Sequence, residues 1–254
     1  MFLPLEYIKY RWNAKGRHGI HSPFVYDFVD KCLRIKLDNP DEVALNQLFD
    51  RLKIDFRQIT IQDFGAGSKK LGNERKVSHI FSMSSSKGKY GELLYRLARH
   101  YQPKRILEFG TSLGVGTTYL ALGAKNTKIT TIEACENTRT IALETIDENS
   151  FIRSELSTFD DYLRGLSIDE QFDLIYVDGH HDGDALLQYM EQLQAHAHDE
   201  TLFILDDIHW SNSMKSAWDR LANDDRFHLS IELFRVGIVS RRSSMEKRKF
   251  VIAY

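Results

Sequence analysis

The chain has 254 residues, of which 42% are hydrophobic and 11% aromatic, and it contains only 4 prolines. This composition excludes a disordered or linker-rich protein, and the length predicts one main core with room for a smaller appendage. No apolar run approaches the roughly 20 residues that span a bilayer, so we expect no membrane partner. The two cysteines, Cys32 and Cys135, lie far apart and suggest neither a disulfide framework nor a zinc site, which fits a reducing, cytoplasmic location.

The first 80 residues predict a mainly helical region. Residues 22–34 begin with a capping serine and a proline at the first helical position, and their apolar side chains form a stripe at helical spacing. A second helix is expected at residues 41–52 and a short strand at residues 59–64. We interpret residues 1–80 as a helical cap or as an arm of a homodimer, and residues 81–254 as the main domain.

Residues 63–72, DFGAGSKKLG, combine an acidic residue, glycines and two lysines, as many nucleotide-binding turns do. No apolar helix follows to supply free amide groups, and no strand with a ribose-binding acid comes next. We therefore predict either a loop that covers a binding site and faces the substrate, or a plain surface loop.

A basic segment covers residues 69–105, where ten lysines and arginines stand against two glutamates, although the formal net charge of the whole chain is −2. Such a segment forms either a solvated face or a surface that meets a phosphorylated or nucleic-acid substrate. Nucleic acid therefore stays open as an alternative partner.

From residue 87 onward, helical and strand periodicities alternate. Helices are predicted at residues 87–101, 115–122, 137–149, 185–195 and 213–221, and strands at residues 105–109, 128–133, 151–156, 172–179 and 201–207. This alternation requires right-handed crossovers and a parallel sheet that is covered on both faces. Two β-type runs at residues 227–242 and 247–254, with no helix between them, predict a closing β-hairpin. The predicted fold class is α/β, with a doubly wound, mostly parallel sheet.

The turn EFGTSLGVGTT at residues 108–118 is the predicted cofactor site, because it follows the first strand of the alternating region and opens a helix. Gly110 and Gly114 allow a tight turn and close backbone approach, and the helix start directs free amides at a negative group. The glycine spacing does not fit a pyrophosphate fingerprint, and no lysine follows as in a P-loop. Glu133 ends the next strand, where a carboxylate accepts hydrogen bonds from ribose hydroxyls. These features predict an adenosine ligand that lacks a pyrophosphate and carries a carboxylate on its tail.

The ordered motifs E-x-G-x-x-x-G-x-G, IEA, FDLIYVDGHH and LFILDDIHW resemble those of class I S-adenosylmethionine-dependent methyltransferases. The resemblance is strongest to their metal-dependent catechol and caffeoyl-CoA O-methyltransferase branch, and it covers residues 83–254. It implies a seven-stranded, Rossmann-like sheet that ends in a β-hairpin, with S-adenosylmethionine as the cofactor. In this resemblance residues 108–116 hold the methionine end, Glu133 the ribose and residues 157–159 the adenine. The cofactor-binding residues that it implies are Glu108, Gly110, Thr111, Ser112, Gly114, Gly116, Glu133, Ser157, Phe159 and Asp178.

Three aspartates end two of the predicted parallel strands. Asp178 follows the fourth strand, and Asp206 and Asp207 follow the fifth, so their carboxylates would crowd one edge of the sheet. A hard divalent cation with oxygen ligands relieves that repulsion. The resemblance implies a metal triad of the same three residues, with asparagine usual in place of Asp207. We predict Mg²⁺, with Ca²⁺ or Mn²⁺ as alternatives. In a metal-free relative the aspartates would instead hold the cofactor, cap a helix or bind substrate.

His181 stands three residues after Asp178, where the resembled enzymes carry a lysine base. A histidine with a pKa near ~6.5 can take a proton from a hydroxyl at neutral pH, particularly one made more acidic by a metal. We predict His181 and Asp178 as catalytic residues, with the fixing of its own loop as the alternative role of His181. His180 and His209 are weaker candidates at the same edge.

The resulting hypothesis is O-methylation of a small hydroxylated acceptor, with S-adenosylmethionine as the methyl donor and a divalent metal orienting the acceptor. N-methylation of RNA or protein is the alternative reaction, favoured by the basic segment. A second alternative is a protein of the same fold that binds the cofactor but catalyses no reaction.

Overall fold

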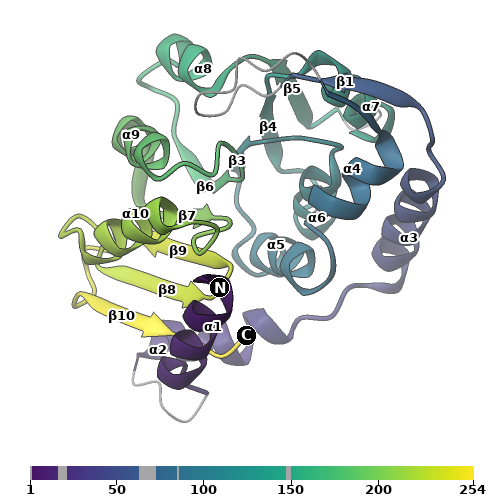
Figure 1. Cartoon of the computed structure of the whole chain (residues 1–254). Helices are drawn as coiled ribbons and strands as arrows, with labels where there is room; N and C mark the ends of the chain where they lie inside the picture. Colours follow the sequence, from purple (N-terminus) through teal and green to yellow (C-terminus); the bar gives the residue numbers. More distant parts are fainter. Residues whose placement is uncertain (1, 17–21, 63–72, 85, 147–149) are drawn as a thin grey trace. The chain divides into compact units, whose positions relative to one another are not determined.

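The computed structural model describes residues 2–16, 22–62, 73–84, 86–146 and 150–254 (Figure 1). The chain forms two compact units. We call Asp27–Tyr162 the central unit, and Met1–Tyr26 with Leu163–Tyr254 the terminal unit. The predicted boundary at residue 80 does not coincide with this division and stays a prediction, and the predicted turn at residues 63–72 lies outside the described residues.

The central unit contains three parallel strands in the order β3-β4-β5. They are β3 (Arg105–Phe109), β4 (Lys128–Glu133) and β5 (Ile152–Leu156). Its helices are α3 (Asn39–Lys53), α4 (Val77–Ser84), α5 (Gly88–Tyr101), α6 (Val115–Gly123) and α7 (Glu136–Ile146), with a short 3₁₀ turn at Cys32–Arg34. Strands β1 (Gln58–Ile61) and β2 (Asn73–Lys76) form a separate antiparallel pair. Four of the five residues of β3 are buried, as expected for a strand covered on both faces.

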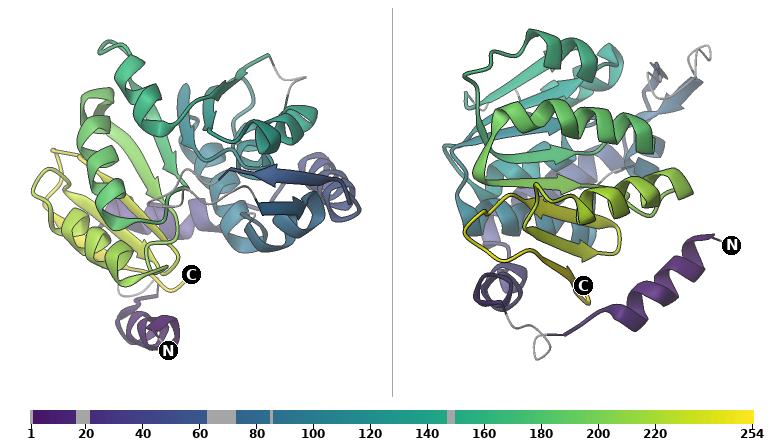
Figure 2. Two further views of the ribbon diagram at one scale, coloured as in Figure 1. Left: turned by 45° about the horizontal axis from the view of Figure 1, so that its top comes forward. Right: turned by 90° about the vertical axis from the view of Figure 1, so that its left-hand side faces the viewer.

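The terminal unit contains five strands in the order β10-β8-β9-β7-β6. They are β6 (Phe172–Val177), β7 (Ala197–Leu205), β8 (Leu229–Leu233), β9 (Val236–Ser240) and β10 (Arg248–Val251). Its helices are α1 (Phe2–Asn13), α9 (Gly183–Leu193) and α10 (Asn212–Asn223), with a 3₁₀ turn at Gln194–His196. Helices α2 (Pro23–Asp30) and α8 (Phe159–Gly165) each continue from one unit into the other. Figure 2 shows α9 and α10 side by side over the strands of this unit.

Polar caps fix the starts of α9 and α10, just after the loops that carry the predicted acidic residues. The Asp182 carboxylate accepts hydrogen bonds from the backbone amides of Asp184 and Ala185. The Ser211 hydroxyl accepts one from the amide of Met214. These caps satisfy amide groups that the helices themselves leave without partners, so each loop ends at a defined residue.

The closing hairpin is present, but different segments form it. Residues 227–242 contain both of its strands, because β8 and β9 pair antiparallel across a tight turn at Phe234 and Arg235. The last run, β10, pairs parallel with β8. The three strands β3–β5 and the five strands β6–β10 make eight described strands, one more than the predicted seven. The additional strand is β10. The sequence shows two β-type runs. It does not show that a two-residue turn divides the first run into two strands.

Helix α1 is fixed to the terminal unit by polar contacts near the end of the chain. The Tyr10 hydroxyl donates to the Ile252 carbonyl at 2.5 Å and accepts from the Tyr254 amide at 3.0 Å. The Lys15 amide donates to the Val251 carbonyl at 2.8 Å. These bonds fix α1 beside β10. A helix of only three turns would be unstable by itself, so α1 depends on these contacts.

The described elements confirm the α/β class with mostly parallel strands flanked by helices, and a helix at the N-terminal end. No helix among the described residues is both long and apolar enough to cross a membrane.

The close packing of α5 on α6 depends on Gly123. A Cβ at residue 123 would lie 2.4 Å from the Tyr95 carbonyl oxygen and 2.9 Å from the Ala98 Cβ. We expect Gly123→Ala to lower the free energy of unfolding by about 1–3 kcal/mol, measured by urea denaturation. Gly165→Ala is the matched control, because nothing lies within 4 Å of a Cβ there. Equal losses in the two variants would contradict this packing.

Candidate functional site

The β3–α6 loop of the central unit has the backbone geometry of a ligand-binding turn. Gly110, Ser112 and Gly114 have φ angles of 101°, 48° and 79°, in the left-handed region that glycine adopts most readily. The amides of Gly110 and Thr111 donate to the Ile132 carbonyl at 3.0 and 3.3 Å, which ties the loop to the end of β4. Gly114 directly precedes α6, so the free amides of the first turn of α6 follow the loop.

Glu108 is completely buried at the end of β3. Its Oε2 accepts a hydrogen bond from the Thr117 hydroxyl at 2.5 Å, whereas its Oε1 has no hydrogen-bond partner. Burial raises the pKa of Glu108 to about 7, and the nearby Glu133 carboxylate acts in the same direction. A buried carboxylate oxygen without a partner is costly, so this position is suited to a donor supplied by a ligand.

Glu133, at the end of β4, holds the same loop from the other side. Its Oε2 accepts from the Ser112 amide at 2.8 Å, and its Oε1 accepts from the Cys135 amide at 2.9 Å. Burial raises the pKa of Glu133, while these amides act against that rise. Each carboxylate oxygen can accept a second hydrogen bond, so Glu133 retains acceptor capacity.

The predicted adenine-binding residues follow β5 and begin α8. The Ser157 amide donates to the Glu133 carbonyl at 3.1 Å, which places Ser157 beside the end of β4. The Phe159 ring is stacked on the buried Phe109 ring, with centroids 4.5 Å apart and planes 7° from parallel. The structure therefore brings Glu108, Ser112, Glu133 and Ser157 to one end of the three parallel strands.

The three predicted aspartates of the terminal unit also lie together, but they share a cation that the sequence reasoning missed. The Arg235 guanidinium donates to both oxygens of Asp206, at 2.8 and 2.7 Å, and its Nε lies 3.1 Å from Oδ1 of Asp207. The Tyr176 hydroxyl lies 3.0 Å from Oδ2 of Asp178 and 3.1 Å from Oδ2 of Asp206. A paired fork of this kind is the strongest protein contact available to a buried carboxylate.

Charge crowding at this edge remains despite Arg235. Burial, together with the charges of Asp206 and Asp207, raises the pKa of Asp178 well above its ordinary value. Burial and the charge of Asp206 also raise the pKa of Asp207. The edge therefore favours a further positive charge or a proton.

Arg235 could have been located only from the strand register. Leu205 of β7 pairs with Gly237 of β9, so continuing the antiparallel register by two residues places Arg235 opposite Asp207. The sequence motif FRVG offers no sign of this pairing.

The cluster with metal-ligand spacing contains Asp178, His181 and Asp207, whose candidate ligand atoms all lie within 4.8 Å of one another. The Nδ1 atom of His181 lies 3.7 Å from Oδ2 of Asp207. Among the described residues this cluster does not include Asp206, both of whose oxygens bind Arg235. The set of three candidate metal ligands therefore contains His181 in place of Asp206, which the sequence predicted.

Backbone conformation sets the direction of these side chains. His180, His181 and Asp207 have φ angles of 64°, 38° and 51°, which are unusual for residues with a Cβ. The exposed Trp210 ring has its centroid 5.5 Å from that of His181. The other two candidate histidines have different contacts. Nδ1 of His180 lies 2.5 Å from the Tyr189 hydroxyl, and the buried His209 lies 3.0 Å from Glu232.

Several cations of the predicted basic segment contribute to the fold itself. Lys87 donates to the Phe81 and Ser82 carbonyls at the end of α4. Arg96 pairs with Glu92 at 2.6 Å, and Arg99 pairs with Asp38 at 3.2 Å. Lys69 and Lys70 lie outside the described residues.

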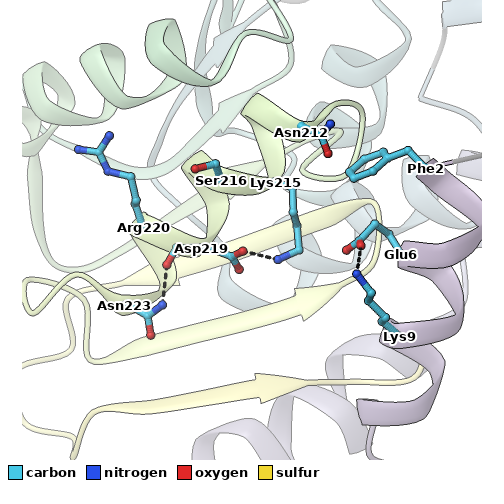
Figure 3. A pocket seen from close by; sticks show the side chains of 9 residues that line it. All are labelled: Phe2, Glu6, Lys9, Asn212, Lys215, Ser216, Asp219, Arg220 and Asn223. Atoms are coloured by element: carbon cyan, nitrogen blue, oxygen red, sulfur yellow. Dashed lines mark hydrogen bonds and ion pairs between the residues drawn. The ribbon is translucent and has the colours of Figure 1, made fainter.

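A cavity of about 620 Å³ opens between α1 and α10 in the terminal unit (Figure 3). Its lining includes none of the predicted site residues. Two of its cations are already paired, Lys9 with Glu6 at 2.6 Å and Lys215 with Asp219 at 2.5 Å. The cavity is therefore a polar groove beside α1, distinct from the acidic edge.

Residues 107–208 match a family model described as a methyltransferase domain. The structure is similar to an SAH-bound methyltransferase from Podospora anserina, with a TM-score of 0.62 and 16% identity over 87% of this chain and 97% of that one. It is also similar to an O-methyltransferase from Bacillus cereus in complex with SAH, with a TM-score of 0.56 and 19% identity over 85% and 97% of the two chains. A third similar structure is the O-methyltransferase TomG from Streptomyces achromogenes in complex with SAM, with a TM-score of 0.55 and 18% identity over 85% and 94%. No curated protein matches the sequence.

Residues 107–208 are therefore similar to a methyltransferase domain, and the chain has the Rossmann-like fold of these methyltransferase structures, as the sequence motifs predicted. Structures similar to it include O-methyltransferases.

The raised pKa of Glu108 makes stability depend on pH. The side chain loses its proton near pH 4.5 when unfolded but only near pH 7 when folded, so its ionisation favours unfolding as pH rises between these values. This group should cost the folded state up to about 3 kcal/mol between about pH 5 and about pH 8. In Glu108→Gln that part of the pH dependence should vanish, as measured by chemical denaturation at several pH values. The exposed Glu136→Gln is the control, and an unchanged slope in Glu108→Gln would contradict the assignment.

Removing Arg235 should leave buried carboxylates without their cation. We expect Arg235→Gln to lower the free energy of unfolding by about 3–5 kcal/mol, and Arg235→Lys to lower it less. Arg226→Gln breaks surface ion pairs with Asp224 and Glu191 and should cost at most about 1 kcal/mol. Urea denaturation measures all three, and equal losses in the two glutamine variants would show that Arg235 contributes no more than a surface charge.

Proposed function

We propose that the chain transfers the methyl group of S-adenosylmethionine to the hydroxyl of a small acceptor, assisted by a divalent cation. The observation that carries the proposal is the Glu108 and Glu133 pair around the β3–α6 loop, within the segment that matches a methyltransferase domain.

The cofactor fits the chemistry of this loop. The ammonium group of the methionine end is a donor suited to the unpartnered Oε1 of Glu108. Its carboxylate suits the free amides at the start of α6. The remaining acceptor capacity of Glu133 suits the ribose hydroxyls, and Ser157, beside the end of β4, lies next to that position. Podospora and Bacillus proteins of this fold were observed with SAH, which supports this choice of ligand.

A divalent cation also fits the acidic edge, through a modified ligand set. Asp178, Asp207 and His181 would hold it, since their ligand atoms have the required spacing. Asp206 would instead hold Arg235. Two carboxylates and an imidazole accept Mg²⁺, and the nitrogen donor favours Mn²⁺ over it. When bound, the cation would make the acceptor hydroxyl more acidic and orient it.

His181 has a second role open to it, because an imidazole beside a carboxylate can accept the acceptor proton. Its ring lies next to the exposed Trp210 ring, whose flat face suits a planar hydroxylated acceptor. As a base, His181 would take the proton directly, with Asp207 stabilising the imidazolium that forms.

The test begins with binding. Calorimetry should detect S-adenosylmethionine binding to wild type, and Glu133→Ala should weaken the affinity at least about tenfold, because it removes the proposed ribose contacts. Glu136→Ala, at the exposed start of α7, is the matched control and should bind as wild type. Absence of binding to wild type would refute the proposed function.

Catalysis is then measured with a panel of hydroxylated aromatic acceptors after chelation, with and without added Mg²⁺ or Mn²⁺. Asp207→Ala, which removes the proposed oxygen ligand, should lower the rate with metal at least about a hundredfold. His181→Gln separates the two roles of His181. Loss of metal affinity would make it a ligand, whereas loss of rate at saturating metal with unchanged affinity would make it the base. A wild-type rate that stays the same after chelation and does not rise on adding Mg²⁺ or Mn²⁺ would contradict the metal part of the proposal.

A further inference from the structure

Helix α1 presents two different sides. Toward its own unit it places Tyr10, which bonds the end of β10, and Glu6, whose Oε2 lies 3.7 Å from Nδ1 of the buried His209. On its other side Leu5, Ile8 and Trp12 are 52%, 61% and 88% exposed. Their spacing of three and four residues places them in one stripe along the helix. This outer stripe, Leu5, Ile8 and Trp12, is an apolar surface on a helix that is otherwise firmly bound.

The charges beside the outer stripe are positive. Arg11 and Lys15 are exposed, and the Lys9 side chain is 69% exposed. The single acidic residue among residues 1–16, Glu6, is only 7% exposed and pairs with Lys9. An apolar stripe bordered by cations therefore has no exposed acidic neighbour within its own segment.

We infer that α1 docks on the surface of an anionic lipid bilayer, with the outer stripe inserted among the headgroups. Because the other side of α1 is bound to the protein, only the outer stripe would enter the interface, where apolar side chains are buried about 5–10 Å deep. A tryptophan is the side chain best suited to that depth, since its ring is amphipathic. Each cation near an anionic surface adds about 1 kcal/mol of attraction, so Arg11 and Lys15 select negatively charged lipids, whereas the charge of Lys9 is offset by Glu6.

A second copy of the chain fits the outer stripe less well. Pairing two stripes would bring the same cations of both copies together, which is repulsive. The stripe spans eight residues, with a rise of about 10 Å from Leu5 to Trp12, whereas a stable interface buries about 800 Å² on each partner.

The inference departs from the expectation of no membrane partner. That expectation rested on the length needed to span a bilayer, a criterion that does not detect a helix lying on its surface.

The test is sedimentation of the purified chain with vesicles of phosphatidylcholine alone or of an equal mixture of phosphatidylcholine and phosphatidylglycerol. Wild type should partition into the mixed vesicles at least about tenfold more strongly than into the neutral ones, and added salt should weaken this preference. Ile8→Glu with Trp12→Glu should abolish binding, and Arg11→Glu with Lys15→Glu should remove the lipid preference.

The matched control is Ile54→Glu with Phe56→Glu, two residues of the central unit that are 71% and 66% exposed. This variant should bind mixed vesicles as wild type does. The inference is overturned if wild type binds neither vesicle, binds both equally, or is a dimer in light scattering that Ile8→Glu with Trp12→Glu converts to a monomer. Circular dichroism establishes that each variant is folded, which is expected because every replaced side chain is exposed.

Discussion

The ion pair between Arg235 and Asp206 is the interaction on which the acidic edge depends. It joins the β8–β9 turn to the end of β7, where it fixes the loop that carries Asp207. A buried pair of this kind does little for net stability compared with apolar packing, but it becomes very costly to break from one side. Its role here is to hold side chains in place, because Arg235 binds both oxygens of Asp206, while the candidate ligand atoms of Asp178, His181 and Asp207 lie within 4.8 Å of one another.

Both units use the same electrostatic device. Each holds carboxylates at strand ends where burial raises their pKa values, and each meets part of that cost with donors from its own chain. In the central unit the donors are the Thr117 hydroxyl and the Ser112 amide, and in the terminal unit they are Tyr176 and Arg235. The negative charge that these donors do not compensate attracts cationic ligands. Binding such a ligand should therefore stabilise the folded state.

The sequence predicts what local periodicity determines. The helices and strands predicted between residues 87 and 221 match their positions to within a few residues, although α8 was not predicted. Glu108, Glu133, Asp178, Asp206 and Asp207 lie at strand ends as expected. What periodicity leaves open is pairing between distant segments. The parallel pairing of β10 with β8, the place of Arg235 and the exposure of Trp12 all follow from strand register or from the docking of a helix, and no local residue pattern specifies them.

The left-handed backbone at His180, His181 and Asp207 sets a limit on how far this protein can be stabilised. Each such residue costs about 1–3 kcal/mol relative to a relaxed conformation, a cost that glycine would largely remove. Selection for stability alone would therefore tend to place glycine at these positions, which would remove the imidazole and carboxylate of the proposed metal site. The strain retained at these three positions would be the stability cost of the proposed chemistry.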